Sequence, residues 1–247
     1  MKTQKYKKSP IIEVVCEFRF ELENESDATL PGMYFSLVKE KFPIKKQRSL
    51  GTMVPIEGSK GEAEMVVSHL AQFYNQEETQ LIQIGSNLLS INCLKNYPFW
   101  ENFSQSIMEI FTKYLEVAKP KAIKRIALKS INKIEIANQT FELPDYFKFF
   151  PASPNNIETP VKNFSLHIET SLNDGRDILA MKNVSTISDN IGNSAFILDF
   201  EYIMNKPGGV ELNEVENWLE IAHEQLYRAF DESITEKLKL DFEPIDI

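Results

Sequence analysis

Hydrophobic and polar residues alternate along the first strongly patterned stretch of the chain, residues 11–23. The apolar side of the alternation consists of Val14, Cys16, Phe18, Phe20 and Leu22. The other side consists of Glu13, Val15, Glu17, Arg19, Glu21 and Glu23. Successive side chains of a β-strand point to opposite faces, so this period of two predicts a strand with one buried face and one face in water.

The remainder of the first half alternates between apolar runs and polar connections. The predicted elements are a short helix ending near residue 43, an irregular hairpin or loop over 44–63, strands over 64–74, 79–85 and 87–94, and a long helix over 96–119. The apolar residues of the long helix recur every three or four positions: Trp100, Phe103, Ile107, Ile110, Phe111, Tyr114 and Ala118. Such a stripe predicts that one side of the helix packs on an apolar surface.

The second half repeats this order. The predicted elements are a strand over 123–136, a short aromatic helix over 143–151, strands near 162–172, 177–187 and 194–204, and a closing helix over about 213–238. Asn213, with Glu216 three residues later, resembles a capping box at the start of the closing helix. Trp218 lies in the first turn of this helix, as Trp100 does in the earlier one.

Each half therefore reads as strand, short helix, three strands and long helix. We expect two α+β repeats, 1–120 and 121–247, that pack as one compact unit. Antiparallel strands with one apolar face, each set followed by a one-sided helix, predict sheets with the long helices on one face. The order resembles TATA-binding-protein-like or helix-grip folds, a comparison of architecture that carries no function.

Composition and charge narrow the classes of function. The net charge of −9 and the pI near 5.0 argue against a duplex nucleic-acid binder, because neutralising phosphates needs a basic face. A cluster of lysines precedes the first strand and is predicted to be a solvated tail: Lys2, Lys5, Lys7 and Lys8. Cys16 and Cys93 lie in apolar alternation and are predicted to be reduced core residues. No apolar run reaches 18 residues and no signal peptide is evident, so we expect a cytoplasmic protein without membrane contact.

The charged sides of two strands form the first candidate site. Its residues are Glu13, Glu17, Arg19 and Glu21 in the first half, and Arg125, Lys129 and Lys133 in the second. If these faces enclose a barrel, they suit a polyphosphate with a divalent metal, as in the triphosphate tunnel enzymes, although here Arg19 stands between acids. If the sheet is open, the same charges pair across neighbouring strands in water.

The three histidines, His69, His167 and His223, have no spacing typical of a metal site. His223, with Glu220 and Glu224 nearby, is the best single candidate for acid–base chemistry or ligand contact, and a hydrogen-bonded histidine at the margin of the core is the alternative. Nucleophile and phosphate-loop motifs are absent from the sequence. We therefore assign no catalytic residue, no metal ligand and no cofactor.

Several blocks resemble a sporadically distributed prokaryotic protein family of about this length. They are SPIIEVVCEFRF, LIQIGSNLLSINCLKNYPFWENF, KRIALKSINKIEI, FILDFEY and WLEIAHEQLYRAFDESIT. Members carry an arginine and a tyrosine where this chain has Lys129 and Ser130. The resemblance implies one compact unit and no established activity. Such families often accompany accessory, phage-defence or toxin–antitoxin genes.

These observations favour a non-enzymatic binding protein. The family resemblance suggests that it is an accessory or antitoxin-like component of a prokaryotic defence or toxin–antitoxin cassette. Its expected partner is another protein or a small ligand, bound by a sheet face, by a cleft between the repeats or by an aromatic segment. The aromatic segment consists of Tyr146, Phe147, Phe149 and Phe150. The alternative is an enzyme or sensor that handles a phosphate-containing ligand or nucleotide on the charged sheet face with a divalent metal. Single-stranded nucleic acid is a third partner class, which the net charge disfavours.

Overall fold

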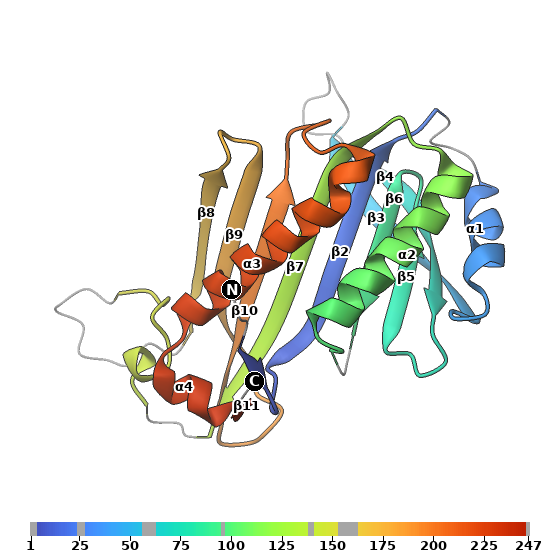
Figure 1. Ribbon diagram of the computed structural model, residues 1–247. Coiled ribbons are helices and arrows are strands. Elements are labelled where there is room, and N and C mark those ends of the chain that lie inside the picture. The colour runs from blue at the N-terminus through green and yellow to red at the C-terminus, as the bar shows by residue number, and fades with distance from the viewer. Residues whose placement is uncertain are drawn as a thin grey trace.

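A computed structural model describes residues 4–23, 28–55, 63–94, 97–137, 141–152 and 163–245. The chain is a mixed α+β protein built on a nine-stranded antiparallel sheet (Figure 1). The strands of this sheet are β2 (Ile11–Glu21), β3 (Ile44–Pro55), β4 (Ala63–Tyr74), β5 (Gln80–Ile84), β6 (Leu88–Cys93), β7 (Ala122–Ile136), β8 (Ser165–Leu172), β9 (Asp177–Thr186) and β10 (Ser194–Met204). The antiparallel α+β class predicted from the sequence is thus confirmed.

The strand order is β3-β4-β5-β6-β2-β7-β10-β9-β8. The first strand of each half, β2 or β7, lies at the centre, and the last strand of each half, β6 or β10, pairs with it. β2 and β7 pair with each other from Ile11 and Asn132 to Glu21 and Ala122. One sheet therefore runs through both halves, and it is open, because β3 and β8 are its edges.

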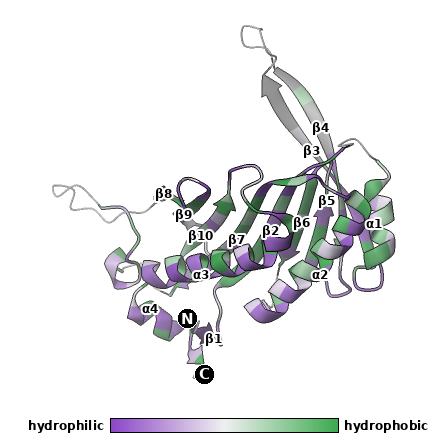
Figure 2. Cartoon of the chain, turned by 45° about the horizontal axis from the view of Figure 1, so that its top comes forward, coloured by the Kyte–Doolittle hydropathy of each residue, from purple (hydrophilic) through white to green (hydrophobic). Residues whose placement is uncertain are grey.

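Two helices of 19 residues, α2 (Trp100–Ala118) and α3 (Val215–Ser233), lie on the same face of the sheet (Figure 1). Hydrophobic residues concentrate in the central strands and on the helix sides that meet them (Figure 2). The apolar stripe of α2 is buried against the apolar face of β2, where Phe111 stacks on Phe18 at 4.8 Å. Shorter helices, α1 (Leu30–Val38) and α4 (Glu236–Asp241), flank this layer. No helix within the described ranges is long and apolar enough to span a membrane.

The sequence predicts an irregular hairpin or a loop over residues 44–63, and the structure agrees with the hairpin rather than with the loop. Residues Ile44–Pro55 form the edge strand β3, which pairs with β4 over the whole of that stretch. An edge strand tolerates charged side chains such as Lys45, Lys46 and Arg48, which hide its strand character in the sequence. The tip of this predicted loop, residues 56–62, lies outside the described part of the chain.

The closing helix also differs from the prediction. α3 ends at Ser233, and Ile234 takes an extended conformation that bridges to Phe147. Thr235 then caps α4 by accepting a hydrogen bond from the Leu238 N–H. At the other end, the capping box is formed by Glu211 and Glu214 rather than by Asn213 and Glu216; it opens a short 3₁₀ turn, η2 (Leu212–Glu214), that leads into α3.

The two ends of the chain meet beneath α3. β1 (Lys5–Tyr6) pairs with β11 (Pro244–Ile245), and the Lys7 N–H donates to the Glu243 carbonyl at 3.0 Å. Gln4 adds a side-chain hydrogen bond to the Ile245 carbonyl at 2.9 Å. The predicted solvated tail is therefore wrong for residues 4–8, which are held in place; Lys2 lies outside the described residues.

Candidate functional site

The predicted charged site lies on the sheet face opposite the helices. Arg125 pairs with Glu17 of β2 at 3.0 Å and with Glu201 of β10 at 2.6 Å, and Arg19 pairs with Glu17 at 3.1 Å. The strands involved are neighbours in an open sheet, so of the two alternatives the one with charges paired across neighbouring strands holds, and the barrel interior does not. Pairs between partly exposed groups of this kind each contribute about 0–1 kcal/mol.

The other predicted members of this face are also engaged by neighbours. Lys129 pairs with Asp199 at 3.0 Å, and Lys133 pairs with Asp189 at 2.5 Å. Glu13 accepts a hydrogen bond from Asn92 Nδ2 at 2.8 Å, whereas Glu21 is exposed. The face contains an open hollow of about 430 Å³ around Arg125, but its acids are balanced by adjacent bases. It therefore offers a divalent metal no set of uncommitted carboxylates.

The aromatic segment predicted to bind a partner lies largely against the core. Phe147 is fully buried and contacts Phe196 edge-to-face at 5.0 Å. Tyr146, Phe149 and Phe150 are half-buried and pack on the same core. The predicted helix is reduced to a single 3₁₀ turn, η1 (Leu143–Asp145). Phe147 cannot touch a partner in this conformation; partner binding by the other three stays a prediction.

Among the histidines, His223 lines two cavities of the described structure. His69 contacts Ser49 Oγ at 3.0 Å on the exposed hairpin, and His167 lies 3.3 Å from Glu169 on β8. No group of three His, Cys, Asp or Glu side chains close enough to hold a metal occurs among the described residues. Cys16 and Cys93 are both buried, and burial raises the pKa of the Cys16 thiol, as expected of a core residue.

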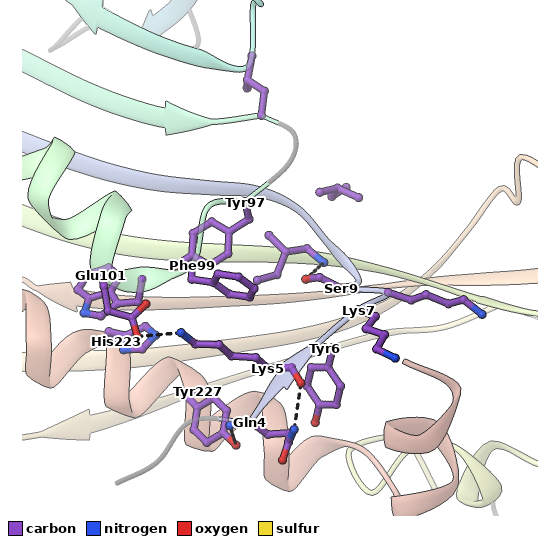
Figure 3. A pocket seen from close by; sticks show the side chains of 15 residues that line it. Gln4, Lys5, Tyr6, Lys7, Ser9, Tyr97, Phe99, Glu101, His223 and Tyr227 are labelled. Carbon is purple, nitrogen blue, oxygen red and sulfur yellow. Dashed lines mark hydrogen bonds and ion pairs between the residues drawn. The ribbon is translucent and has the colours of Figure 1, made fainter. Parts of the chain in front are cut away.

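His223 opens into a cleft of about 670 Å³ between β1, the start of α2 and the middle of α3 (Figure 3). Its lining combines three lysines, five aromatic rings and one histidine: Lys5, Lys7, Lys8, Tyr6, Tyr97, Phe99, Trp100, Tyr227 and His223. α2 belongs to the first half and α3 to the second, so the cleft lies at the junction of the halves. We call it the junction cleft.

The wall of the junction cleft contains a stacked pair of rings. The His223 and Trp100 rings are parallel within 1°, with centroids 4.3 Å apart. Trp100 is fixed from its other edge, because its Nε1–H donates to both carboxylate oxygens of Glu220, at 2.8 and 2.9 Å. Burial lowers the pKa of His223 to about 4, an effect that Glu101 partly opposes. At neutral pH the imidazole is therefore uncharged and presents a flat, apolar surface.

The mouth of the junction cleft is basic. Lys5 pairs with Glu101 at 3.0 Å and lies 4.6 Å from the centre of the Phe99 ring. Lys7 and Lys8 are exposed, and Lys8 pairs with Glu243 at 2.5 Å. Lys5 and Lys8 are thus each paired with a glutamate, and Lys7 is the lysine of the lining that has no ion pair among the described residues. An anionic ligand could take the place of these exposed glutamates at the lysines.

Phe99 holds a backbone conformation that is rare for a residue with a side chain. Its φ of 64° and ψ of 162° lie in a region populated almost only by glycine. The strain turns the chain sharply after Pro98, so that Tyr97 is directed inward while Phe99 stays partly exposed at the mouth. Burial raises the pKa of Tyr97. Strain of this kind persists where the surrounding structure enforces it, often at ligand sites.

The chemistry available in the junction cleft is recognition: ring stacking, hydrogen bonding and attraction of an anion. Its titratable groups are lysines, tyrosines, one glutamate paired with Lys5 and a neutral imidazole. Sequence reasoning found His223 but missed the lysines and aromatic residues around it. The block NYPFWE could have indicated the site, because it places Tyr97, Phe99 and Trp100 at the start of a predicted helix.

No protein-family model matches this chain, and no curated protein is significantly similar to it. The resemblance to a sporadically distributed prokaryotic family thus stays a prediction from the blocks quoted above.

Proposed function

We propose that this protein is a non-enzymatic binding protein that captures a small anionic ligand in the junction cleft. One observation carries the proposal: the cleft unites three lysines with a cluster of aromatic rings on an otherwise acidic chain. Cationic groups beside aromatic faces suit ligands that carry a negative charge on an organic body. The cleft volume of about 670 Å³ lies in the range of ligand pockets.

The assignment as a binder rather than an enzyme rests on the groups that face the cleft. Its only histidine stacks on Trp100 and is neutral, and its glutamate is paired with Lys5. A general base works best when its pKa lies near the working pH, and a pKa of about 4 leaves His223 a weak one. The lysines are at the mouth, where they attract charge.

A charge-removal experiment tests the proposal. Lys5→Gln, Lys7→Gln and Lys8→Gln are combined, and calorimetry and thermal shifts are measured against a panel of organic carboxylates and phosphates. We expect at least one ligand to bind the natural protein and to lose tenfold or more in affinity to the triple variant. The matched control combines Lys39→Gln, Lys121→Gln and Lys148→Gln, which removes the same charge from exposed positions elsewhere. Equal losses in both variants, or no ligand at all, contradict a specific site.

We also infer that the two halves descend from one duplicated unit arranged as in TATA-binding-protein-like folds. The support is topological: each half places its first strand at the centre, pairs its last strand with the first, and continues into a 19-residue helix with a tryptophan in the opening turn. The halves differ at the edges, since five strands of the nine-stranded sheet precede α2 and four lie between α2 and α3. This comparison concerns architecture, and the function is argued from the junction cleft alone.

The proposal also includes a cytoplasmic accessory role with another protein as partner. In this role the protein is an antitoxin-like component of a prokaryotic defence cassette. Its support is the family resemblance of the sequence blocks. Affinity purification from the native host with mass spectrometry tests it, with the Lys5, Lys7 and Lys8 triple variant as comparison. A protein recovered alone at every salt concentration argues against a stable partner.

A further inference from the structure

A second, smaller cavity lies beneath the junction cleft, between α3 and the central strands β2 and β7. Its volume is about 100 Å³. It shares lining residues with the cleft, among them Tyr97, Trp100, His223 and Tyr227, so the two spaces adjoin at the stacked rings. We call it the inner chamber. A ligand that enters past the lysines meets the chamber at the Trp100 and His223 edge.

The floor of the inner chamber is polar although it is deeply buried. Asn132 is 2% exposed, and its Nδ2 donates to Ser130 Oγ and to the Leu198 carbonyl, each at 3.2 Å. No hydrogen bond to the Asn132 Oδ1 atom is found among the described residues, and this atom is not one of the fully enclosed polar atoms without a partner, which are Tyr6 Oη, Tyr114 Oη and Asn183 Oδ1. The chamber therefore offers an acceptor at Asn132 and, at Ser130, a hydroxyl that is free to donate.

The walls of the inner chamber are apolar. They are formed by Val14 of β2, Leu128 of β7, and Leu226 and Phe230 of α3. Apolar walls above a donor and acceptor pair are the usual make-up of a specific small-molecule pocket. A chamber of about 100 Å³ is smaller than the roughly 150 Å³ cavity that accommodates benzene in an engineered protein, so at most one six-membered ring fits after modest adjustment.

We propose that the ligand is an organic anion with one planar six-membered ring, here called a single-ring anion, which inserts the edge of that ring into the inner chamber and leaves its carboxylate or phosphate at the lysines. The inference rests on the binding function proposed for the junction cleft and specifies its ligand. Asn132 Oδ1 accepts from a ring N–H or O–H, and the Ser130 hydroxyl donates to a ring oxygen or nitrogen. The Trp100 and His223 rings flank the passage, and Lys5 exchanges Glu101 for the anion of the ligand.

The experiment separates the ring from the anion. Binding to the natural protein is measured by calorimetry for uridine monophosphate, 4-hydroxybenzoate, adenosine monophosphate, uridine and inorganic phosphate. A single-ring anion is expected to bind at least tenfold more tightly than either half-ligand and than the purine nucleotide. The first two compounds distinguish a phosphate source of the anion from a carboxylate source.

Two variants assign the binding to the inner chamber. Ser130→Val fills the chamber and removes its hydroxyl, and Asn132→Leu removes the acceptor; thermal unfolding shows which variant keeps the fold. Either folded variant is expected to lose tenfold or more in affinity for the single-ring anion while its weak affinity for phosphate is unchanged. Unchanged single-ring binding in both variants, or equal binding of the purine, overturns the chamber assignment and leaves the cleft proposal standing. If none of the organic anions binds, the proposal that the junction cleft binds an anionic ligand is itself wrong.

Discussion

At the scale of single residues, the junction cleft depends on His223 being neutral. The imidazole stacks on Trp100, and the charged groups around it are Glu101 of α2, Glu220 of α3 and Lys5 of β1. Burial is the dominant influence and lowers its pKa to about 4. Protonation would place a charge in a partly apolar wall, where the attraction of Glu101 offsets only part of the cost of burial. We therefore expect low pH to weaken the stacking of His223 on Trp100.

His223→Phe should reduce the acid sensitivity of the fold. The folded pKa of about 4 lies below the unfolded value near 6.5, so between these pH values the unfolded chain binds a proton that the folded chain does not. Stability is therefore lost as the pH falls from 6.5 to 4, by at most about 3 kcal/mol, and no further loss from this group follows below 4. Phe keeps a flat ring against Trp100 and cannot titrate.

The measurement is urea unfolding of both proteins at several pH values. Relative to pH 7.5, the natural protein should lose more free energy of unfolding than the variant, and the gap should open between pH 6.5 and 4. The carboxylates titrate in both proteins and cancel in the difference. Parallel curves over this window would show that the His223 ring is accessible to water in the folded state.

At the scale of elements, α3 is fixed to the sheet by a buried carboxylate. Asp177 at the start of β9 is 0% exposed and accepts hydrogen bonds from Trp218 Nε1 at 3.2 Å, Tyr202 Oη at 3.0 Å and Arg176 Nη2 at 2.7 Å. Burial by itself raises its pKa, but the hydrogen bonds from Arg176, Asn173, Trp218 and Tyr202 outweigh it and lower the pKa below its usual range. The second tryptophan of the chain is therefore an anchor.

Asp177→Asn should lower the free energy of unfolding by about 2 kcal/mol, because it leaves Arg176 without its charge partner and weakens the bond to Trp218. Combined with Trp218→Phe, the two losses should be non-additive by at least about 0.5 kcal/mol in a double-mutant cycle. Urea unfolding measures both. Asp174→Asn makes the same change at an exposed position of the same turn and should be nearly neutral, since asparagine tolerates its φ of 53°. Fully additive losses would mean that Asp177 and Trp218 act independently.

The elements that could be predicted from the sequence are those in which the spacing of apolar residues determines which side is buried. The stripe of α2 and the alternation of β2 gave their type and approximate extent, and the structure places both as predicted. For β3 the sequence left hairpin and loop open, because pairing with β4 imposes the extended structure on a polar, basic stretch. The end of α3 could not be predicted, since the apolar stripe continues through Ile234 and only the bridge to Phe147 interrupts the helix.

The candidate site was less predictable for a related reason. The charged faces of β2 and β7 could be identified from the alternation of residues. Whether these faces enclose a space depends on the strand order, which one sequence does not reveal. The junction cleft and its chamber are assembled from four segments that are distant in sequence: 5–8, 97–101, 130–132 and 223–227. No local pattern joins them, and the lysines near the N-terminus are held by contacts with distant segments, the pairing of β1 with β11 and the ion pair of Lys5 with Glu101.

At the scale of the whole molecule, the two halves should unfold together. β2 and β7 pair along their length at the centre of the sheet, and one continuous cluster of buried side chains contains residues of both halves. A boundary between independent domains crosses few contacts, and this boundary crosses the middle of the core. The junction cleft is therefore lined by parts that cannot separate without loss of the fold.

The two tryptophans make this testable. Trp100→Phe leaves Trp218 as the reporter of the second half, and Trp218→Phe leaves Trp100 as the reporter of the first. In each variant, the urea midpoint from fluorescence should coincide with the midpoint from far-ultraviolet circular dichroism, because one cooperative transition gives the same midpoint by every probe. Each variant is compared only with itself, so its own loss of stability does not matter. The prediction fails if the fluorescence midpoint lies above the dichroism midpoint in one variant and below it in the other. That result would mean that the halves unfold separately and that the junction cleft can open by partial unfolding.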